Sequence, residues 1–458
     1  MNQSDTIVAP ASGAGRAAVA VIRVSGPGTT DVLKALCGAL PTPRHATLRK
    51  LHDPRAGALL DRGLVLWFPA PSSFTGEDMA ELQVHGSRAV TGAVIEAALA
   101  VEGTRLAEPG EFARRAFENG KIDLTEVEGL ADLVNAETEA QRRQALAQAE
   151  GSLRRLYQGW RAELLKAQAL MEAGLDFSDE GDVVADVQTK AEMIVRELRA
   201  EIATQLADRR GERLRDGYRV VIAGPPNAGK SSLLNALARR DAAIVSEEAG
   251  TTRDVIEVHL DLAGVPVILI DTAGLRATEG AVEAEGVRRA LARAGEADLV
   301  LWLVDATDPK WSPPEGFQGF HAIANADGVV SGQKTSIPVL FAVLNKRDLA
   351  PDLKLQEGLI AVSAKTGEGL EDLVKVLENR VISTSSWDAG APPLTRVRHR
   401  QELQGAHAAL ARFLDKSLIP ELKADELRVA ARHLGRLTGH IDVEEVLGAL
   451  FAEFCIGK

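Results

Sequence analysis

Aromatic residues, cysteines and long apolar runs are scarce in this chain of 458 residues. Only 4% of the residues are aromatic, and two cysteines, Cys37 and Cys455, are too few for a disulfide framework, which favours a reducing compartment. Apolar runs such as Leu299–Val304 are a handful of residues long, whereas a membrane span needs about 20. The first residues lack the features of a signal peptide. We therefore expect a cytoplasmic, multidomain protein with no membrane partner.

The chain also lacks an excess of positive charge. Its 53 basic and 65 acidic side chains give a net charge of −12, which argues against non-specific nucleic-acid binding because such binding depends on neutralising phosphates. The acidic excess lies in residues 121–216 and 217–382, each with a net charge of −6, while residues 1–120 and 383–458 are neutral. A nucleic-acid partner would have to be held at local surfaces or by another protein.

Composition changes along the chain and indicates four segments. Residues 1–120 are typical of mixed α and β structure, residues 121–216 and 383–458 have a helical composition, and residues 217–382 alternate short apolar strands with helical patterns. The alternation predicts a mostly parallel sheet, inserted into one helical domain. A polar stretch at 308–336 predicts a long loop or insertion. The expected strands include Val19–Val24, Gly63–Phe68, Glu81–His85, Tyr218–Ala223, Val265–Ile270, Leu299–Val304, Val339–Leu344 and Leu359–Val362.

A phosphate-binding motif follows the first expected strand of the inserted domain. Residues 224–231 read Gly-Pro-Pro-Asn-Ala-Gly-Lys-Ser and match GxxxxGK[ST] between a strand and a helix. The glycines let backbone N–H groups surround phosphate oxygens, while Lys230 supplies a charge to the β- and γ-phosphates and Ser231 a hydroxyl to Mg²⁺. The nucleotide-binding residues predicted here are Asn227, Ala228, Gly229, Lys230, Ser231 and Ser232.

Three further motifs follow in the order that is typical of GTP-binding proteins. An Asp-Thr-Ala-Gly motif comes after an expected strand and can act on Mg²⁺ and the γ-phosphate. An Asn-Lys-Arg-Asp motif follows another strand, and its aspartate can accept two N–H bonds from guanine. Alone, the Asn-Lys-Arg-Asp motif could be a surface turn. A Ser-Ala-Lys motif ends the next expected strand, and the four motifs in this order predict a doubly wound, Ras-like P-loop GTPase domain. The residues concerned are Asp271, Thr272, Ala273, Gly274, Asn345, Lys346, Asp348, Ser363, Ala364 and Lys365.

The position that usually orients the attacking water is altered. Ras-type proteins have a glutamine after the Asp-x-x-Gly motif, and Leu275 at this position cannot orient water. Charge stabilisation could come from a monovalent cation held by Asn227 and a threonine-rich switch segment, or from Arg253 or Arg276, or turnover could be slow. Within that segment Thr252 is the better candidate for contacting Mg²⁺ and the γ-phosphate. Downstream carboxylates that could replace the glutamine are Glu279, Glu283 and Glu285.

Short sequences along nearly the whole chain resemble one family. They are Asp5–Ala9, Ile22–Pro27, Ser73–Asp78, Glu81–Gly86, Pro109–Phe112, Asn119–Leu124 and the C-terminal Phe454–Lys458. Together with the GTPase motifs they are similar to the bacterial tRNA-modifying GTPases of the MnmE (TrmE) family. The resemblance implies an α+β tetrahydrofolate-binding and dimerisation domain at 1–120, an all-α domain in two parts at 121–216 and 383–458, and the GTPase domain at 217–382.

The resemblance also implies an activity and partners. Members hydrolyse GTP with K⁺, form homodimers, and act with a flavoprotein (MnmG, or GidA) in a heterotetramer. Together the two proteins add an aminomethyl or carboxymethylaminomethyl group to carbon 5 of the wobble uridine, position 34, of certain tRNAs. A 5-formyl- or 5,10-methylene-tetrahydrofolate supplies the one-carbon unit, and FAD enters only through the partner. The alternative is a ribosome-assembly or regulatory GTPase switch, which the absence of a basic KH-type sequence disfavours.

Carried over by position, the family's site residues fall on defined positions of this chain. Glu283 would orient the attacking water, and Cys455 is a candidate for the chemistry on the one-carbon unit. The folate contacts would be Arg23, Glu81, Lys121 and Lys458. The metal ligands would be Ser231 and Thr252 for Mg²⁺, and Asn227, Ser246, Glu248 (through its backbone) and Thr251 for K⁺. The switch residues that contact GTP would be Ser246, Glu247, Glu248, Ala249, Gly250, Thr251 and Thr252.

Simpler explanations exist for some of these residues. Arg23 could be an exposed residue at the end of a strand, and Glu81 a charge at a strand edge. Cys455 could be a small buried apolar side chain. The basic run Arg396–Arg400 could be a solvated helix face or a contact for tRNA phosphates.

Overall fold

The protein folds into two compact units. The first comprises Met1–Ala131, Gln148–Val195 and Arg412–Lys458, and the second comprises Asp132–Ala147 and Arg196–Ala411. The structure is a computed structural model that describes residues 5–13, 15–176, 181–239, 257–271, 297–308, 321–322, 339–353, 359–385, 392–439, 441, 447–448, 450–451, 454 and 457. Within these residues no helix combines the length and the apolar composition that crossing a bilayer requires.

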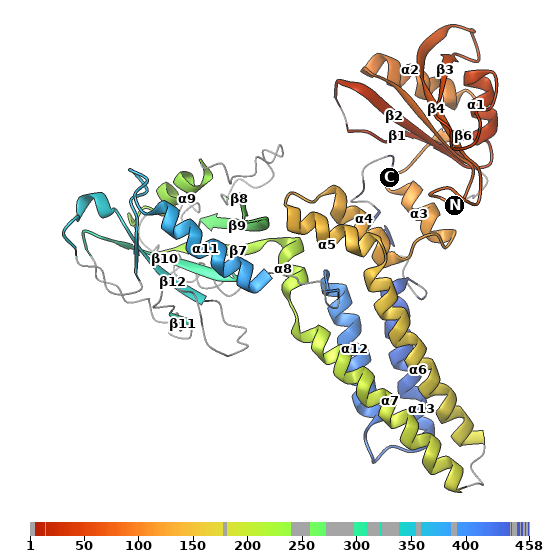
Figure 1. The fold of residues 1–458 in the computed structure, drawn as a ribbon. Helices are drawn as coiled ribbons and strands as arrows, with labels where there is room; N and C mark the ends of the chain where they lie inside the picture. Colours follow the sequence, from red (N-terminus) through yellow and green to blue (C-terminus); the bar gives the residue numbers. More distant parts are fainter. Residues whose placement is uncertain are drawn as a thin grey trace, which may run out of the picture. The chain divides into compact units, whose positions relative to one another are not determined.

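A six-stranded sheet forms the N-terminal part of the first unit (Figure 1). Its order is β3-β4-β5-β2-β1-β6, with β1 and β6 parallel and all other neighbours antiparallel. The strands are β1 (Thr6–Pro10), β2 (Ala17–Ser25), β3 (Thr47–His52), β4 (Leu59–Phe68), β5 (Met79–Gly86) and β6 (Thr104–Leu106). Along β2, Ala20, Ile22 and Val24 point to one face and share a core with buried side chains of α1 (Thr29–Cys37) and α2 (Arg88–Leu99).

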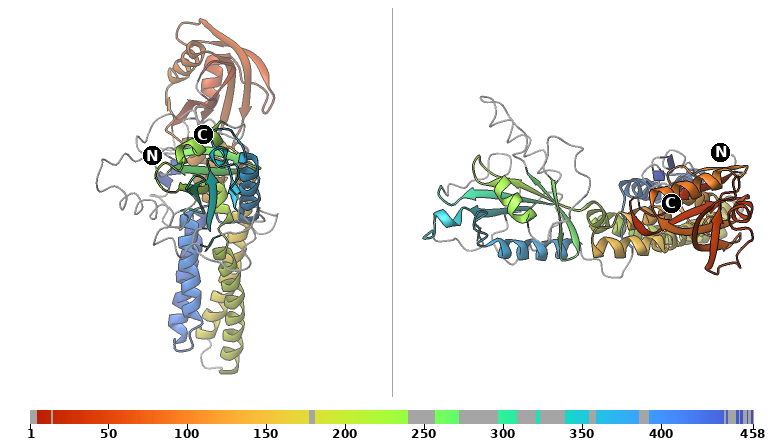
Figure 2. Two further views of the ribbon diagram at one scale, coloured as in Figure 1. Left: turned by 90° about the vertical axis from the view of Figure 1, so that its left-hand side faces the viewer. Right: turned by 90° about the horizontal axis from the view of Figure 1, so that it is seen from above.

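Helices make up the rest of the first unit, wholly or in part. They are α3 (Glu111–Glu118), α4 (Leu124–Val134), α5 (Glu139–Ala149), α6 (Ser152–Asp176), α7 (Gly181–Ala207), α12 (Val397–Phe413) and α13 (Pro420–Thr438). Figure 2 shows α6 and α13 side by side, and the two helices are in contact. Phe451 and Phe454 near the C-terminus pack on Leu124 and Val127 of α4. The C-terminal end of the chain therefore joins the core of this unit.

The second unit is built on a mostly parallel sheet of seven strands. Its order is β11-β12-β10-β7-β9-β8, and β13 pairs with β12 beyond the short β11. Only the pairing of β8 with β9 is antiparallel. The elements are β7 (Tyr218–Ala223), β8 (Glu257–Leu262), β9 (Val265–Asp271), β10 (Leu299–Asp305), β11 (His321–Ala322), β12 (Val339–Asn345), β13 (Ile360–Ala361), the 3₁₀ helix η2 (Arg347–Leu349), α8 (Arg210–Asp216), α9 (Lys230–Ala238) and α11 (Leu370–Ser385).

Apolar side chains bury both faces of this sheet, as continuous apolar strands require. On one face α9 contributes Leu233 and Leu237, and α11 contributes Leu373 and Leu377, to a single core. The five strands predicted in this domain are confirmed, although β13 is shorter than expected. β8 was missed, and β11 lies inside the stretch 308–336, most of which is outside the described residues.

Candidate functional site

The phosphate-binding motif forms the loop between β7 and α9. Gly224 has a φ of +148°, and a Cβ at this position would lie 2.5 Å from the carbonyl oxygen of Leu303, so the turn requires glycine. Gly229 has a φ of +91° at the start of α9, where a Cβ would lie 2.2 Å from Nδ2 of Asn345. Asn227 adopts a left-handed conformation with a φ of +63°. The loop thus curls before the N-terminus of a helix, which favours anion binding.

The first two residues of α9 provide a charge and a hydroxyl. Lys230 donates through Nζ to the carbonyl oxygens of Gly224 (3.0 Å) and Pro225 (2.9 Å). Burial lowers the pKa of Lys230, and the nearby charge of Asp271 opposes this effect. Ser231 Oγ donates to Asp271 Oδ2 at 2.5 Å, and Asp271 is only 1% exposed at the end of β9. A hydroxyl and a carboxylate in contact are oxygen ligands that suit Mg²⁺.

One buried side-chain amide connects the phosphate-binding loop to the loop expected to contact the guanine base. Asn345, the last residue of β12, is 2% exposed. Its Nδ2 donates to the carbonyl oxygen of Ala228 (2.8 Å), and its Oδ1 accepts from the backbone N–H of Ala364 (3.1 Å). Because a buried amide without partners is costly, both loops are held to this side chain.

Two more side chains of the Asn-Lys-x-Asp motif have specific partners. Asp348 Oδ1 accepts from Ser363 Oγ at 2.7 Å, and Lys346 Nζ lies 2.6 Å from Asp305 Oδ2 at the end of β10. Burial acts to raise the pKa of Asp305, but hydrogen bonds from Lys346 and Thr307 outweigh it, so this pKa is held below its usual range. The motif therefore lies at the carboxyl ends of parallel strands, where ligands bind in such sheets.

The structure describes one part of the predicted nucleotide site. This part consists of Asn227, Ala228, Gly229, Lys230, Ser231, Ser232, Asp271, Asn345, Lys346, Asp348, Ser363, Ala364 and Lys365. Other predicted residues lie outside the described residues: Ser246, Glu247, Glu248, Ala249, Gly250, Thr251, Thr252, Thr272, Ala273, Gly274, Glu283, Cys455 and Lys458. Within the described residues no group of three His, Cys, Asp or Glu side chains is arranged to hold a metal. Among the described residues, the Ser231 hydroxyl and the Asp271 carboxylate are oxygen ligands that could share a metal with phosphates and water.

A pocket of about 420 Å³ in the first unit is a second candidate site. Its charged lining residues are Arg23, Arg44 and Glu81, and its apolar walls include Phe68, Phe74 and Phe454. Arg23 and Glu81 are neighbours on β2 and β5, with Nε and Oε1 2.9 Å apart, and Nη1 of Arg23 is 3.5 Å from the carbonyl oxygen of Gly457. Lys121 is not among the lining residues, and its Nζ donates to the carbonyl oxygen of Pro71 at 3.0 Å.

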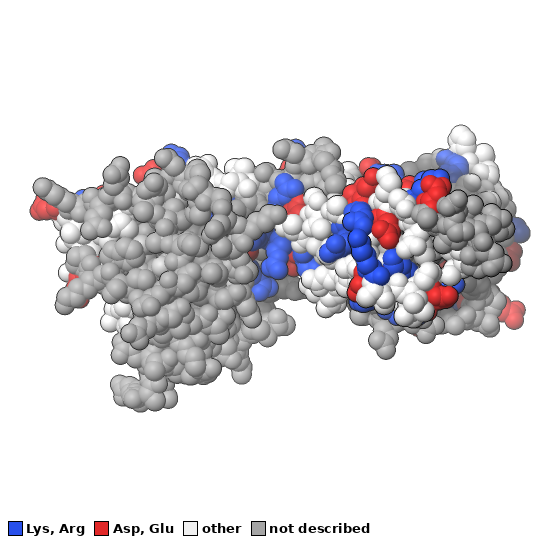
Figure 3. Space-filling model, turned by 90° about the horizontal axis from the view of Figure 1, so that it is seen from below, with Lys and Arg blue, Asp and Glu red and all other residues white. Residues whose placement is uncertain are grey.

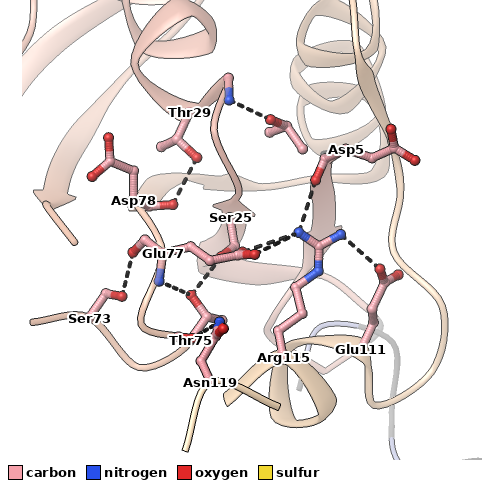
Figure 4. A network of polar contacts seen from close by, with 12 residues as sticks. Asp5, Ser25, Thr29, Ser73, Thr75, Glu77, Asp78, Glu111, Arg115 and Asn119 are labelled. Carbon is pink, nitrogen blue, oxygen red and sulfur yellow. Dashed lines mark hydrogen bonds and ion pairs between the residues drawn. The ribbon is translucent and has the colours of Figure 1, made fainter. Parts of the chain in front are cut away.

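A buried ion-pair network supports one wall of this pocket (Figure 4). Arg115 of α3 lies 3.1 Å from a carboxylate oxygen of Glu77 and 3.0 Å from one of Glu111, and it donates to the carbonyl oxygen of Asp5 at 2.9 Å. The carbonyl oxygen of Glu77 in turn accepts a hydrogen bond from Ser73, a lining residue. Strand, loop and helix are therefore tied together behind the pocket wall.

Arg44 is a charged lining residue that the sequence did not identify. It lies in the connection before β3, and no motif includes it. Its guanidinium lies over the ring of Phe68, with Cζ 5.7 Å from the ring centroid. No spacing pattern links residue 44 to the other lining residues, so only the fold reveals it.

The basic run at 396–400 is largely ion-paired within the second unit. Arg396 Nη2 lies 2.8 Å from Asp132 Oδ1, and Arg400 Nε lies 2.8 Å from Glu212 Oε1. Both arginine side chains are 13% exposed. These two residues are thus neither a solvated face nor open to phosphate. On the face drawn in Figure 3, basic and acidic side chains lie beside one another over the described residues.

The parallel sheet, the curled loop before α9 and the motifs at the strand ends define a Ras-like P-loop GTPase domain, here carried with an N-terminal sheet domain and a helical domain. Two family models match the chain: "GTP-binding protein TrmE N-terminus" over residues 6–121 and "MnmE helical domain" over residues 124–455. The chain belongs to the MnmE family of tRNA modification GTPases, which confirms the resemblance.

Relatives match from end to end. A "tRNA modification GTPase MnmE" of Parvibaculum lavamentivorans is 52% identical over 460 residues, covering 99% of this chain and 100% of the relative. Proteins with the same name from Rhodopseudomonas palustris and Paramagnetospirillum magneticum are 52% and 53% identical, covering 100% and 99% of this chain and all of each relative.

Proposed function

We propose that this protein hydrolyses GTP in the modification of the wobble uridine, position 34, of certain tRNAs. The observation that carries the proposal is the placement of Lys230, Ser231 and Asp271 at one end of a parallel sheet, with Asn345 and Asp348 beside them. The first three suit phosphates and Mg²⁺, and the Asp348 carboxylate suits the two N–H donors of guanine. Membership of the MnmE family supplies the tRNA part of the proposal.

Hydrolysis in this proposal depends on K⁺. Thr252 joins Ser231 as a Mg²⁺ ligand, and Glu283 orients the attacking water in place of the glutamine that Leu275 replaces. The K⁺ ligands are Asn227, Ser246, Glu248 and Thr251. Asn227 supports this role because its left-handed backbone places it in the curled loop, and its side chain is exposed. A K⁺ ion bound there would place positive charge at the phosphates. In Ras-type proteins an arginine finger supplies this charge.

The N-terminal pocket in this proposal binds the tetrahydrofolate donor, as its 5-formyl or 5,10-methylene form. Arg23 and Glu81 line that pocket, and the proposed site also includes Lys121, Lys458 and Cys455, the candidate for the chemistry on the one-carbon unit. A volume of about 420 Å³ with several aromatic walls is suited to a ligand with a flat ring. The protein acts as a cytoplasmic homodimer and binds a flavoprotein of the MnmG (GidA) type, which carries FAD, as a heterotetramer.

The cation part is tested by GTP turnover of the full chain in K⁺ and in Na⁺ at equal ionic strength. We expect faster turnover in K⁺, and a collapse in Glu283→Ala with nucleotide affinity unchanged. Equal rates in the two salts would remove K⁺ from the proposal, and full activity of Glu283→Ala would remove the glutamate.

The tRNA part is tested by mass analysis of wobble uridines from cells that lack this protein. We expect uridines without the aminomethyl-type group, restored by the wild-type gene and not by a Lys230→Ala gene. Fully modified uridines in the deletion strain would contradict the proposed function.

A further inference from the structure

The lining of the N-terminal pocket has two arginines but only one carboxylate, so it carries a net positive charge. Of its three charged lining residues, Arg23 and Glu81 neutralise each other at 2.9 Å. Arg44 remains, and no carboxylate of the described residues is paired with it. Arg44 is an exposed residue at the edge of the pocket, and the Phe68 ring covers one side of its guanidinium, so the charge attracts an anion more strongly than a fully solvated charge would.

Arg44 is fixed in place by its own backbone and side chain. Its φ of +61° is left-handed, and its N–H donates to the carbonyl oxygen of Trp67 at 2.8 Å. The guanidinium donates to the carbonyl oxygen of Ser72 and lies over the Phe68 ring. A guanidinium has five N–H groups, so these contacts leave donors for a ligand. A charge that is already positioned loses little entropy when it binds.

The sheet register separates this cation from the neutral ion pair. Glu81 is opposite Leu66 of β4, and Phe68, on which Arg44 lies, is two residues further along the strand. Two residues span about 7 Å of a strand. The pocket therefore has two distinct polar regions. The Arg23–Glu81 pair is neutral overall, Arg44 is positively charged, and aromatic side chains line the pocket around them.

We propose that Arg44 binds the carboxylate end of the ligand in this pocket and selects for ligands that have one. The inference rests on the proposed folate site, because a folate has a flat ring system at one end and a glutamate with two carboxylates at the other. A guanidinium matches a carboxylate with paired hydrogen bonds. Arg44 is thus a specificity-determining residue, which discriminates a folate from the same molecule without its glutamate.

The test compares two ligands on the full chain by calorimetry: 5-formyltetrahydrofolate and 5-formyltetrahydropteroate, which lacks only the glutamate. Wild type should bind the first about tenfold more tightly, the size expected for one hydrogen-bonded charge. Arg44→Met, which keeps a Cβ in the same left-handed conformation, should bind both equally, at the wild-type affinity for the pteroate. Arg44→Lys should keep part of the preference. Arg55→Met is the matched control, because Arg55 is exposed in the same domain and pairs with Asp53 away from the pocket.

Each outcome decides a separate question. If wild type binds neither ligand, the proposed folate site fails. If it binds both equally, or if Arg44→Met keeps the preference, the role of Arg44 is wrong while the folate site stands. If Arg44→Met weakens both ligands equally and Arg44→Lys does the same, Arg44 only shapes the pocket. The wild-type preference should also shrink with added salt, because the charge is partly exposed.

Discussion

The buried arginine behind the pocket wall allows a quantitative prediction. Arg115 is 7% exposed and contacts two carboxylates, Glu77 with 17% and Glu111 with 4% of the side chain exposed. Arg115→Met keeps the apolar length of the side chain and removes the charge. The variant leaves Glu77 and Glu111 buried with fewer partners, which is the costly way to break an ion pair.

We expect Arg115→Met to lower the free energy of unfolding by an amount at the low end of the range for a broken buried ion pair. Such changes cost about 3–5 kcal/mol when the remaining charge has no other partner. Here Glu111 keeps Arg105 at 2.6 Å, and Glu77 keeps the Ser25 hydroxyl at 2.8 Å. We therefore expect the free energy of unfolding of the first unit to fall by about 3 kcal/mol. Arg412→Met is the control: its side chain is 52% exposed and pairs with Glu426 in the same unit, away from this network, so its loss should cost about 1 kcal/mol or less.

The cost should depend on pH. Burial acts to raise the pKa of Glu111, but hydrogen bonds from Arg105, the Glu108 backbone and Arg115 outweigh it and lower this pKa to about 2. A lowered carboxyl pKa stabilises the fold above the ordinary value and loses this effect as pH falls towards the folded value. The difference between wild type and Arg115→Met should thus be largest near neutral pH and shrink below about pH 4.5.

Urea unfolding at several pH values, with hydrogen exchange of residues 71–78, measures this prediction. The exchange should become faster at 71–78 in Arg115→Met and remain unchanged in the second unit. A loss below about 1 kcal/mol at neutral pH, or a loss that is the same at pH 7 and pH 3, would refute the ion-pair argument.

Three further changes test other contacts. Asp348→Asn replaces an acceptor by a donor at the guanine edge, so affinity for GDP should fall about a hundredfold or more while affinity for xanthosine diphosphate rises; competition binding measures both, and an unchanged preference would contradict the guanine contact. Gly229→Ala places a Cβ 2.2 Å from Asn345 Nδ2 at a φ of +91°, so nucleotide affinity and thermal stability should both fall; a variant with wild-type binding would show that the loop can relax. Gly457→Ala places a Cβ 2.0 Å from the carbonyl oxygen of Pro10 at a φ of +105°, so tetrahydrofolate affinity should fall while GDP affinity stays; equal loss of both would indicate a general folding defect.

The GTPase motifs could be placed on the fold from the sequence because each motif is local. The phosphate loop is eight consecutive residues, 224–231, and each base-side motif directly follows an apolar strand. In a parallel sheet such strand ends meet at one edge, so spacing alone places the motifs together. β8 was missed because Glu257–Leu262 alternates polar and apolar residues at the sheet edge, without the apolar run of a central strand.

The N-terminal pocket could not be predicted in the same way. Its wall combines residues 23, 44, 68, 81 and 454, which come from five separate segments. Only the pairing registers of β2, β4 and β5 bring these segments together, and register depends on which faces are buried. The resemblance pointed to Arg23 and Glu81, but Arg44 is in no motif, and its left-handed backbone is a feature of the folded chain.

The ion pairs of Arg396 and Arg400 affect how this acidic protein could bind tRNA. To contact a tRNA phosphate, Arg396 would have to leave Asp132, which also pairs with Arg215 at 3.0 Å, and Arg400 would have to leave Glu212. Breaking a largely buried pair takes a partner away from a carboxylate, which costs more than one partly exposed phosphate contact returns. These arginines therefore hold the second unit together and do not form a surface for tRNA phosphates on this acidic chain. In the proposed reaction, tRNA affinity must come from other surfaces or from the flavoprotein, and binding by this chain alone should be weak and salt-sensitive.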